Sequence, residues 1–298
     1  MVKKILAILI CLKCVTFCAA SNYEQRYNHA TAIILGITQG ITEFLPISST
    51  GHMILVDKLL NDEFGSDNLT TRSRAMNSYF TIIQCGSILA IILVFYRRIL
   101  SIFAAFCGRN LEGLQLVKNL LVSLLPAIVV GLFFDGILQK LLYNPTSIAC
   151  ALIIGAALIF TFEKKYSHVQ NFLNINELRT FSAFKIGLWQ CLAMIPGTSR
   201  SMATILGGYS CKLKRQDAAE YSFLLGLATL FLATVFKLIK DHEAIFDCFT
   251  LPTFFTGIFT AFIFSILTIK IFLSFLATNG MRPFAWYRIL LGILILLN

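Results

Sequence analysis

Residues 36–53 read GITQGITEFLPISSTGHM, and this stretch decides the fold class. Apolar residues lead into it from Ala32, and apolar residues resume at Met53. Between them, Glu43 is followed by Pro46, which ends a helix, and then by a cluster of hydroxyl side chains. Polar side chains set between two apolar segments are typical of a broken helix that lines a polar cavity inside a membrane.

A second stretch, residues 187–206, reads GLWQCLAMIPGTSRSMATIL and resembles the first. In both stretches a glycine stands three residues before a glutamine, at Gly36 with Gln39 and at Gly187 with Gln190. A proline follows each glutamine, and two hydroxyl residues follow each proline, with one residue of offset between the copies. We interpret the two stretches as an internal repeat.

The composition predicts a polytopic membrane protein. Of the 298 residues, 57% are hydrophobic and 13% are charged, and the mean hydropathy is +0.78. Such a chain exposes more apolar surface than a soluble domain of this size tolerates. The net charge of +10 arises from basic residues spread between apolar segments, which indicates a positive-inside topology and argues against a nucleic-acid partner.

Residues 1–27 are expected to form a signal-like leader or an anchor, because two lysines precede an apolar core and small residues follow it. The rest of the chain, 28–298, is expected to form a single membrane domain. Six apolar segments are predicted to span the membrane, and several have nearly the length that crosses a bilayer: 79–96, 117–136, 146–163, 220–238, 252–273 and 284–298.

The motif stretches, about 28–57 and 183–208, are each broken by proline, so we expect two re-entrant helix pairs. Lysine and arginine are more frequent on one set of connecting segments, which we therefore place on the inside of the membrane. The first re-entrant stretch then enters from outside and the second from inside, so the two repeats are inverted. The predicted fold is an all-α integral membrane protein with six transmembrane helices and two re-entrant helix pairs in an inverted repeat. The repeat halves run over about 28–136 and 146–273, and the last helix follows.

The two breaks are predicted to form a phosphate or diphosphate site. Ser49 and Thr50 are expected to cap one helix start. Thr198 and Ser199 are expected to cap the other. The N–H groups and the dipole at a helix start favour an anion. Arg200 adds a planar fork that suits phosphate oxygens, although an arginine at a membrane edge also serves topology alone.

Glu43 and Gln39 are one helical turn apart, so they share a face of the predicted helix. A carboxylate and an amide oxygen form a reasonable pair for Mg²⁺ or Ca²⁺, with phosphate and water completing the shell. The alternative is an interfacial Glu43 that faces lipid headgroups. His52 borders the same break and is suited to protonate a leaving group, activate water or attack phosphorus; the alternative is a structural histidine.

These motifs resemble a known family. EFLPISSTGH at 43–52 and PGTSRS at 196–201 are similar to the two signature motifs of the undecaprenyl-diphosphatase family, also called bacitracin-resistance proteins. The segments 84–90, 220–225 and 283–288 also resemble parts of that family. The likeness extends from about residue 28 to the end of the chain.

The resemblance implies a membrane phosphatase that hydrolyses undecaprenyl diphosphate to undecaprenyl phosphate and inorganic phosphate. It implies recycling of the lipid carrier for peptidoglycan synthesis, bacitracin resistance and a divalent-metal requirement. It further implies a place in the bacterial cytoplasmic (inner) membrane, with the active site open to the periplasm. One departure is Gln39, which stands at the first acidic position of the family's E-x-x-x-E pattern.

By motif match, the resemblance assigns the essential acid to Glu43, positions next to the scissile phosphate to Ser49 and His52, and phosphate binding to Ser199 and Arg200. The predicted catalytic residues are Glu43, Ser49, His52 and Arg200. The predicted substrate-binding residues are Ser48, Thr50, Thr198, Ser199 and Ser201, and the predicted metal ligands are Glu43 and Gln39. The nucleophile stays open between His52, Ser49 and water.

The expected partners are a polyprenyl diphosphate and membrane lipids, and a homodimer is allowed for. The alternative function is a transporter of a polyprenyl phosphate or another anion, because inverted repeats with helix breaks at the midplane are also a transporter design. A histidine next to a metal-capable glutamate favours chemistry over transport, since transport needs neither.

Overall fold

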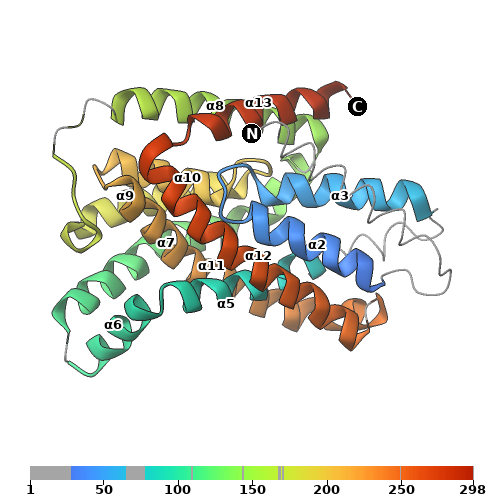
Figure 1. Cartoon of the computed structure of the whole chain (residues 1–298), viewed down its shortest axis with the longest axis horizontal. Helices are drawn as coiled ribbons and strands as arrows, with labels where there is room; N and C mark the ends of the chain where they lie inside the picture. The colour runs from blue at the N-terminus through green and yellow to red at the C-terminus, as the bar shows by residue number, and fades with distance from the viewer. Residues whose placement is uncertain are drawn as a thin grey trace. The chain divides into compact units, whose positions relative to one another are not determined.

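The computed structural model in Figure 1 describes residues 28–64, 78–108, 110–142, 144–166, 169, 171–248 and 250–297. These residues are almost entirely helical, which confirms the expected all-α class. The predicted leader at 1–27 lies outside the described residues.

Helices account for most of the described residues. In chain order they are α2 (His29–Thr42), α3 (Ser49–Phe64), α5 (Gln84–Val94), α6 (Tyr96–Phe106), α7 (Leu111–Leu142), α8 (Pro145–Tyr166), α9 (Thr180–Cys191), α10 (Arg200–Ser210), α11 (Arg215–Cys248), α12 (Leu251–Asn279) and α13 (Arg282–Leu297). Two 3₁₀ turns, η1 (Ile175–Glu177) and η2 (Leu192–Met194), flank α9.

Within the described residues, 4 segments are long and apolar enough to cross a membrane: Leu111–Gly131, Pro145–Tyr166, Arg215–Ile239 and Leu251–Asn279. These helices coincide with four of the apolar segments predicted from the sequence, near 117–136, 146–163, 220–238 and 252–273. The agreement arises because each segment combines sufficient helical length with a nearly uncharged sequence.

The other two predicted spans look different. The segment near 79–96 belongs to a bent pair of helices, Ser78–Val94 followed by Tyr96–Phe106. The chain bends by 79° between the two helices. This pair makes a fifth span if both helices count as one. The span predicted near 284–298 falls on α13, which has 16 residues. The arrangement with six spans therefore stays a prediction.

The described residues form two compact units. The first unit contains the described residues up to Ile41 together with those of His52–Ala90 and Leu230–Ser265. The second unit contains those of Thr42–Gly51, Ile91–Thr229 and Ile266–Asn298. Because residues 43–51 and 196–201 both fall in the second unit, that unit positions the candidate site.

In the first unit, glycines bring helices into backbone contact with α12. A Cβ atom at Gly36 would lie 2.6 Å from the carbonyl oxygen of Gly257, and one at Gly40 would lie 2.7 Å from that of Ala261. On α5, a Cβ atom at Gly86 would overlap the carbonyl oxygen of Ile258. Small residues are the usual means of close helix packing in membranes, where apolar side chains gain little from leaving lipid.

The second unit uses the same device at α9. A Cβ atom at Gly187 would overlap the backbone of Ser123 on α7. The Ser123 hydroxyl donates a hydrogen bond to the carbonyl oxygen of Ala183 at 2.6 Å and lies 2.6 Å from the Tyr221 hydroxyl. Elsewhere in this unit α13 lies along α8 (Figure 1), and α10 contacts both α8 and α9.

Glycine-to-alanine substitutions at two positions should affect the stability of the protein differently. Gly86→Ala should lower the free energy of unfolding by about 1–3 kcal/mol, because the new methyl group meets backbone atoms that cannot move aside. Gly131→Ala on α7 should leave it unchanged or raise it by up to about 1 kcal/mol, because alanine favours the helix and the nearest atom, in the Met194 side chain, is 3.4 Å away. Unfolding in detergent measures both. Equal effects of the two substitutions would contradict this packing.

Candidate active site at two helix N-termini

Both motif breaks end in a serine with a positive φ angle. Ser48 has φ 73° and Ser199 has φ 64°, in the left-handed region that side-chain-bearing residues seldom adopt. The Ser48 hydroxyl accepts a hydrogen bond from the Gly51 N–H at 3.3 Å. The Ser199 hydroxyl accepts one from the Met202 N–H, also at 3.3 Å. The two serines are therefore the N-caps of α3 and α10.

This geometry corrects the predicted capping of α3 by Ser49 and Thr50, and of α10 by Thr198. Ser49 is already the first residue of α3, and its hydroxyl is bound elsewhere. Thr50 is exposed on the first turn, and Thr198 precedes the cap of α10. Since Ser48 and Ser199 stand equally far after their repeat glutamines, the prolines are the residues out of register.

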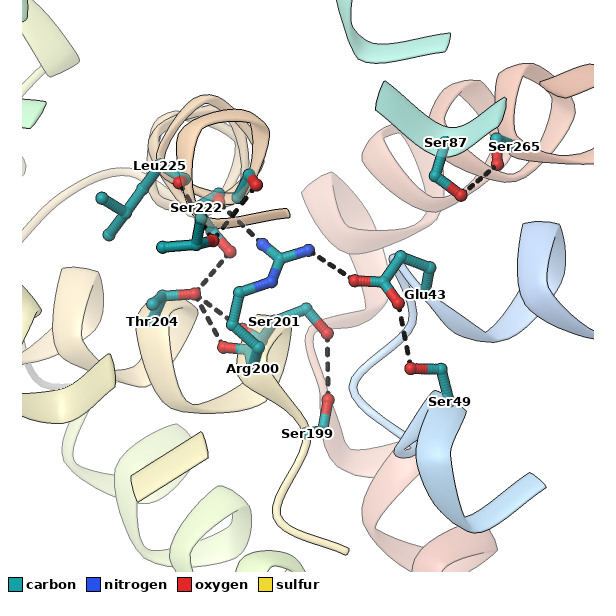
Figure 2. Close-up of polar contacts among 12 residues, drawn as sticks. Glu43, Ser49, Ser87, Ser199, Arg200, Ser201, Thr204, Ser222, Leu225 and Ser265 are labelled. Carbon is teal, nitrogen blue, oxygen red and sulfur yellow. Dashed lines mark hydrogen bonds and ion pairs between the residues drawn. The ribbon is translucent and has the colours of Figure 1, made fainter. Parts of the chain in front are cut away.

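The buried carboxylate of Glu43 joins the two motifs (Figure 2). Its Oε1 accepts a hydrogen bond from Arg200 Nη2 at 2.8 Å, and its Oε2 accepts one from the Ser49 hydroxyl at 2.9 Å. The Glu43 and Arg200 side chains are only 5% and 12% exposed, so both are largely covered by other parts of the protein. Ser49 and Arg200 are the first residues of their helices, and each holds one oxygen of the same carboxylate.

Arg200 is held at further points. Its Nη1 donates to the carbonyl oxygen of Ser222 on α11 at 3.0 Å. A Cβ atom at Gly226 would overlap the guanidinium group, so this glycine provides its space. Within the described residues the buried Nε of Arg200 has no hydrogen-bond partner. Buried donors are seldom left without a partner, so this N–H is a position where an anion can bind.

The backbone of the first break is also bound to the second motif. The Ser201 hydroxyl donates to the carbonyl oxygen of Leu45 at 2.9 Å, and the Ser199 hydroxyl donates to it at 3.5 Å. Thr204 supports the start of α10, because its hydroxyl donates to the Arg200 carbonyl oxygen at 2.8 Å and lies 2.6 Å from the Ser222 hydroxyl. The structure thus brings Glu43, Ser48, Ser49, Ser199, Arg200 and Ser201 together.

Gln39 and His52 belong to the first unit. Gln39 is buried on α2, and His52 is half-buried in the first turn of α3. The contacts described above do not include either side chain. Their assignments as a metal ligand and a catalytic group stay predictions.

The donor set bears on the expected divalent cation. Within the described residues, no group of three or more His, Cys, Asp or Glu side chains is placed to hold a metal ion. The two oxygens of Glu43 accept hydrogen bonds from Arg200 and Ser49, and a carboxylate oxygen can accept more than one bond. The residues fit Mg²⁺ or Ca²⁺ where phosphate oxygens of a substrate supply the other ligands. The metal stays a prediction.

Sequence reasoning did not single out Arg288 on α13. Its side chain is 0% exposed, and its guanidinium donates to the carbonyl oxygens of Pro46 at 3.1 Å and of Gly197 at 3.2 Å. The segment 283–288 carried a family likeness, but a single arginine near an apolar run gives no signal that separates a buried donor from a topogenic charge.

Comparison with known proteins identifies the family. Residues 32–294 match the model of the bacitracin resistance protein BacA family. An undecaprenyl-diphosphatase of Pseudomonas fluorescens is 41% identical over 267 residues, which cover 90% of this chain and 92% of the relative. An undecaprenyl-diphosphatase of Azotobacter vinelandii is 40% identical over 270 residues, which cover 90% of this chain and 93% of the relative. The resemblance of the motifs is confirmed, and the chain belongs to the bacitracin resistance protein BacA family.

Proposed function

We propose that this chain is a membrane phosphatase that hydrolyses undecaprenyl diphosphate to undecaprenyl phosphate and inorganic phosphate. Relatives about 40% identical over nine-tenths of the chain carry the name of that activity. The observation that supports the proposal most directly is the buried Glu43 carboxylate, held by the first residues of two helices from different motifs. Catalysis of phosphoryl transfer needs such a fixed set of charges and donors.

The anion is bound by groups that the two motifs share. The N-termini of α3 and α10 direct N–H groups and positive dipole ends toward their breaks. Arg200 adds a guanidinium whose Nε is without a partner within the described residues. In the proposal a phosphate of the substrate binds to Arg200, and the hydroxyls of Ser48, Thr50, Thr198, Ser199 and Ser201 surround it.

The hydrogen bond from the Ser49 hydroxyl to the Glu43 carboxylate is suited to activating Ser49 as a nucleophile. Glu43 Oε2 accepts the Ser49 hydroxyl hydrogen at 2.9 Å, within the reach of a general base. In the proposal Ser49 Oγ bonds to the terminal phosphorus and Glu43 takes its proton. The bond from phosphorus to the bridging oxygen breaks, and undecaprenyl phosphate leaves. Water then cleaves the phosphoserine and releases inorganic phosphate.

Arg200 stabilises the charge on the transferred phosphoryl group, and His52 supplies a proton to the leaving oxygen. A divalent cation held by Glu43 and Gln39 would neutralise further diphosphate charge when bound. The contacts described for the second unit do not include His52 or Gln39. The support for their roles is the family likeness of the motif that contains His52.

We further propose that the chain lies in the bacterial inner membrane, with six transmembrane helices and two re-entrant pairs arranged as an inverted repeat. The support for this arrangement is the membrane-length helices, the bent pair and the matching caps of Ser48 and Ser199. The family likeness supports a site that opens to the periplasm, where the lipid carrier for peptidoglycan synthesis is recycled. Bacitracin resistance follows from that recycling.

Arg200→Ala should abolish most of the activity. Loss of a charged donor to the transferred phosphoryl group should lower kcat/KM by about 10³-fold or more. Arg98→Ala is the matched control, because Arg98 forms a partly exposed ion pair with Glu220, 2.6 Å away, and should retain activity. Phosphate release from a polyprenyl diphosphate by the purified variants measures the effect.

Full activity of Arg200→Ala would discard this site. A native protein that moves polyprenyl phosphate across vesicles without releasing phosphate would instead support transport.

The nucleophile should be detectable as a covalent intermediate. Brief reaction with a substrate labelled in its terminal phosphate, followed by acid quenching, should leave label on Ser49, because phosphoserine is stable in acid and phosphohistidine is not. Ser49→Ala should accumulate no label, whereas Ser147→Ala, in the first turn of α8, should label normally. Acid-labile label on His52, or rapid turnover by Ser49→Ala, would refute the assignment.

A further inference from the structure

Arg288 is a buried cation that has no acidic partner among the described residues. It is among the largest fully buried side chains, and in the described part of the chain it forms no ion pair. Its guanidinium donates to four backbone carbonyl oxygens of described residues, from Nε to Leu152 at 3.1 Å, from Nη1 to Pro46 at 3.1 Å, and from Nη2 to Ala151 at 3.0 Å and Gly197 at 3.2 Å. Burial of an unpaired charge is costly, so the contacts need a reason beyond packing.

Two of these carbonyl oxygens occupy equivalent positions in the two motifs. Pro46 stands two residues before the cap Ser48, and Gly197 stands two residues before the cap Ser199. One side chain thus binds the same backbone atom in both helix breaks. The other two carbonyl oxygens lie on α8, which serves as the fixed support for the contact.

Two glycines leave the space that the Arg288 contacts with α8 and the second helix break require. A Cβ atom at Gly155 on α8 would overlap the Arg288 guanidinium. Gly197 has φ 92°, and a Cβ atom there would lie 2.6 Å from the carbonyl oxygen of Ile148 on α8. Larger residues at these positions would push either the arginine or the second break away from α8.

The contact fixes where the two caps begin. A carbonyl group held by a hydrogen bond fixes the plane of its peptide unit, and here that unit leads into the cap residue two positions later. Ser48 and Ser199 both adopt left-handed conformations, which persist only where neighbouring structure holds them. The next residues, Ser49 and Arg200, bind the two oxygens of Glu43.

We propose that Arg288 is a positioning residue that ties both helix breaks to α8 and thereby sets Ser49 and Arg200 at their distances from Glu43. The inference rests on the proposed phosphatase function for its catalytic consequence. A planar guanidinium reaches several carbonyl groups at once, whereas a lysine ammonium is a point donor that cannot span them in the same way.

Kinetics test the proposal through Arg288→Lys and Arg288→Met. Misplacement of reacting groups should lower kcat by about 100-fold in the methionine variant, with KM within about threefold of native, and lysine should restore part of the loss. Arg215→Met is the control, because it removes another arginine of the second unit, bound to the buried Glu163 at 2.9 Å. It should lower the melting temperature but keep kcat per folded molecule.

Hydrogen exchange gives a readout that does not need the substrate. In Arg288→Lys, amides in 47–51 and 198–202 should both exchange about tenfold faster than native, while Arg215→Met should leave both unchanged. If the methionine variant fails to fold, the lysine variant decides.

The proposal would be overturned if a folded Arg288 variant kept the native kcat, or if Arg215→Met lowered kcat by the same factor. Faster amide exchange in only one of the two turns would also overturn it. A native protein that releases no phosphate would refute the phosphatase function, and the exchange data would still decide the role of Arg288.

Discussion

The structure of the site depends on one buried carboxylate that binds two helix starts. Glu43 precedes α3 in the chain, while Arg200 begins α10, 157 residues later. An ion pair with this little exposure is costly to form unless neutral groups satisfy the remaining donors and acceptors. Ser49 and the carbonyl oxygen of Ser222 do so here. The pair therefore determines how the two motifs meet, and it leaves a guanidinium N–H for an anion.

Close packing at small residues brings these helices into place. Gly36 allows α2 to contact α12 in the first unit, and its repeat counterpart Gly187 allows α9 to contact α7 in the second. In both repeats the glycine stands 12 residues before the cap serine, at Gly36 with Ser48 and at Gly187 with Ser199. A membrane helix gains little from burying leucine, so a backbone contact of this kind fixes helix position better than a larger apolar side chain would.

The sequence predicted the features that arise from local chemistry. Hydropathy located four membrane-length helices, and the cost of an intramembrane charge indicated that Glu43 and Arg200 act inside the protein. The caps were misplaced within α3 because the prolines of the repeats are one residue out of register, and only the backbone shows that Ser48 adopts the left-handed conformation. The role of Arg288 could not be predicted, since its contacts join segments that are distant in the sequence and a single arginine carries no local signal.

A double-mutant cycle on Glu43 and Arg200 tests the central claim most directly. The free energy of unfolding in detergent is measured for the native protein, Glu43→Gln, Arg200→Met and the double variant. Each single substitution leaves a buried group without its partner, so the double variant should lose about 1–3 kcal/mol less than the sum of the single losses. Losses that add to within about 0.5 kcal/mol would mean that the two side chains do not interact, and would contradict the account.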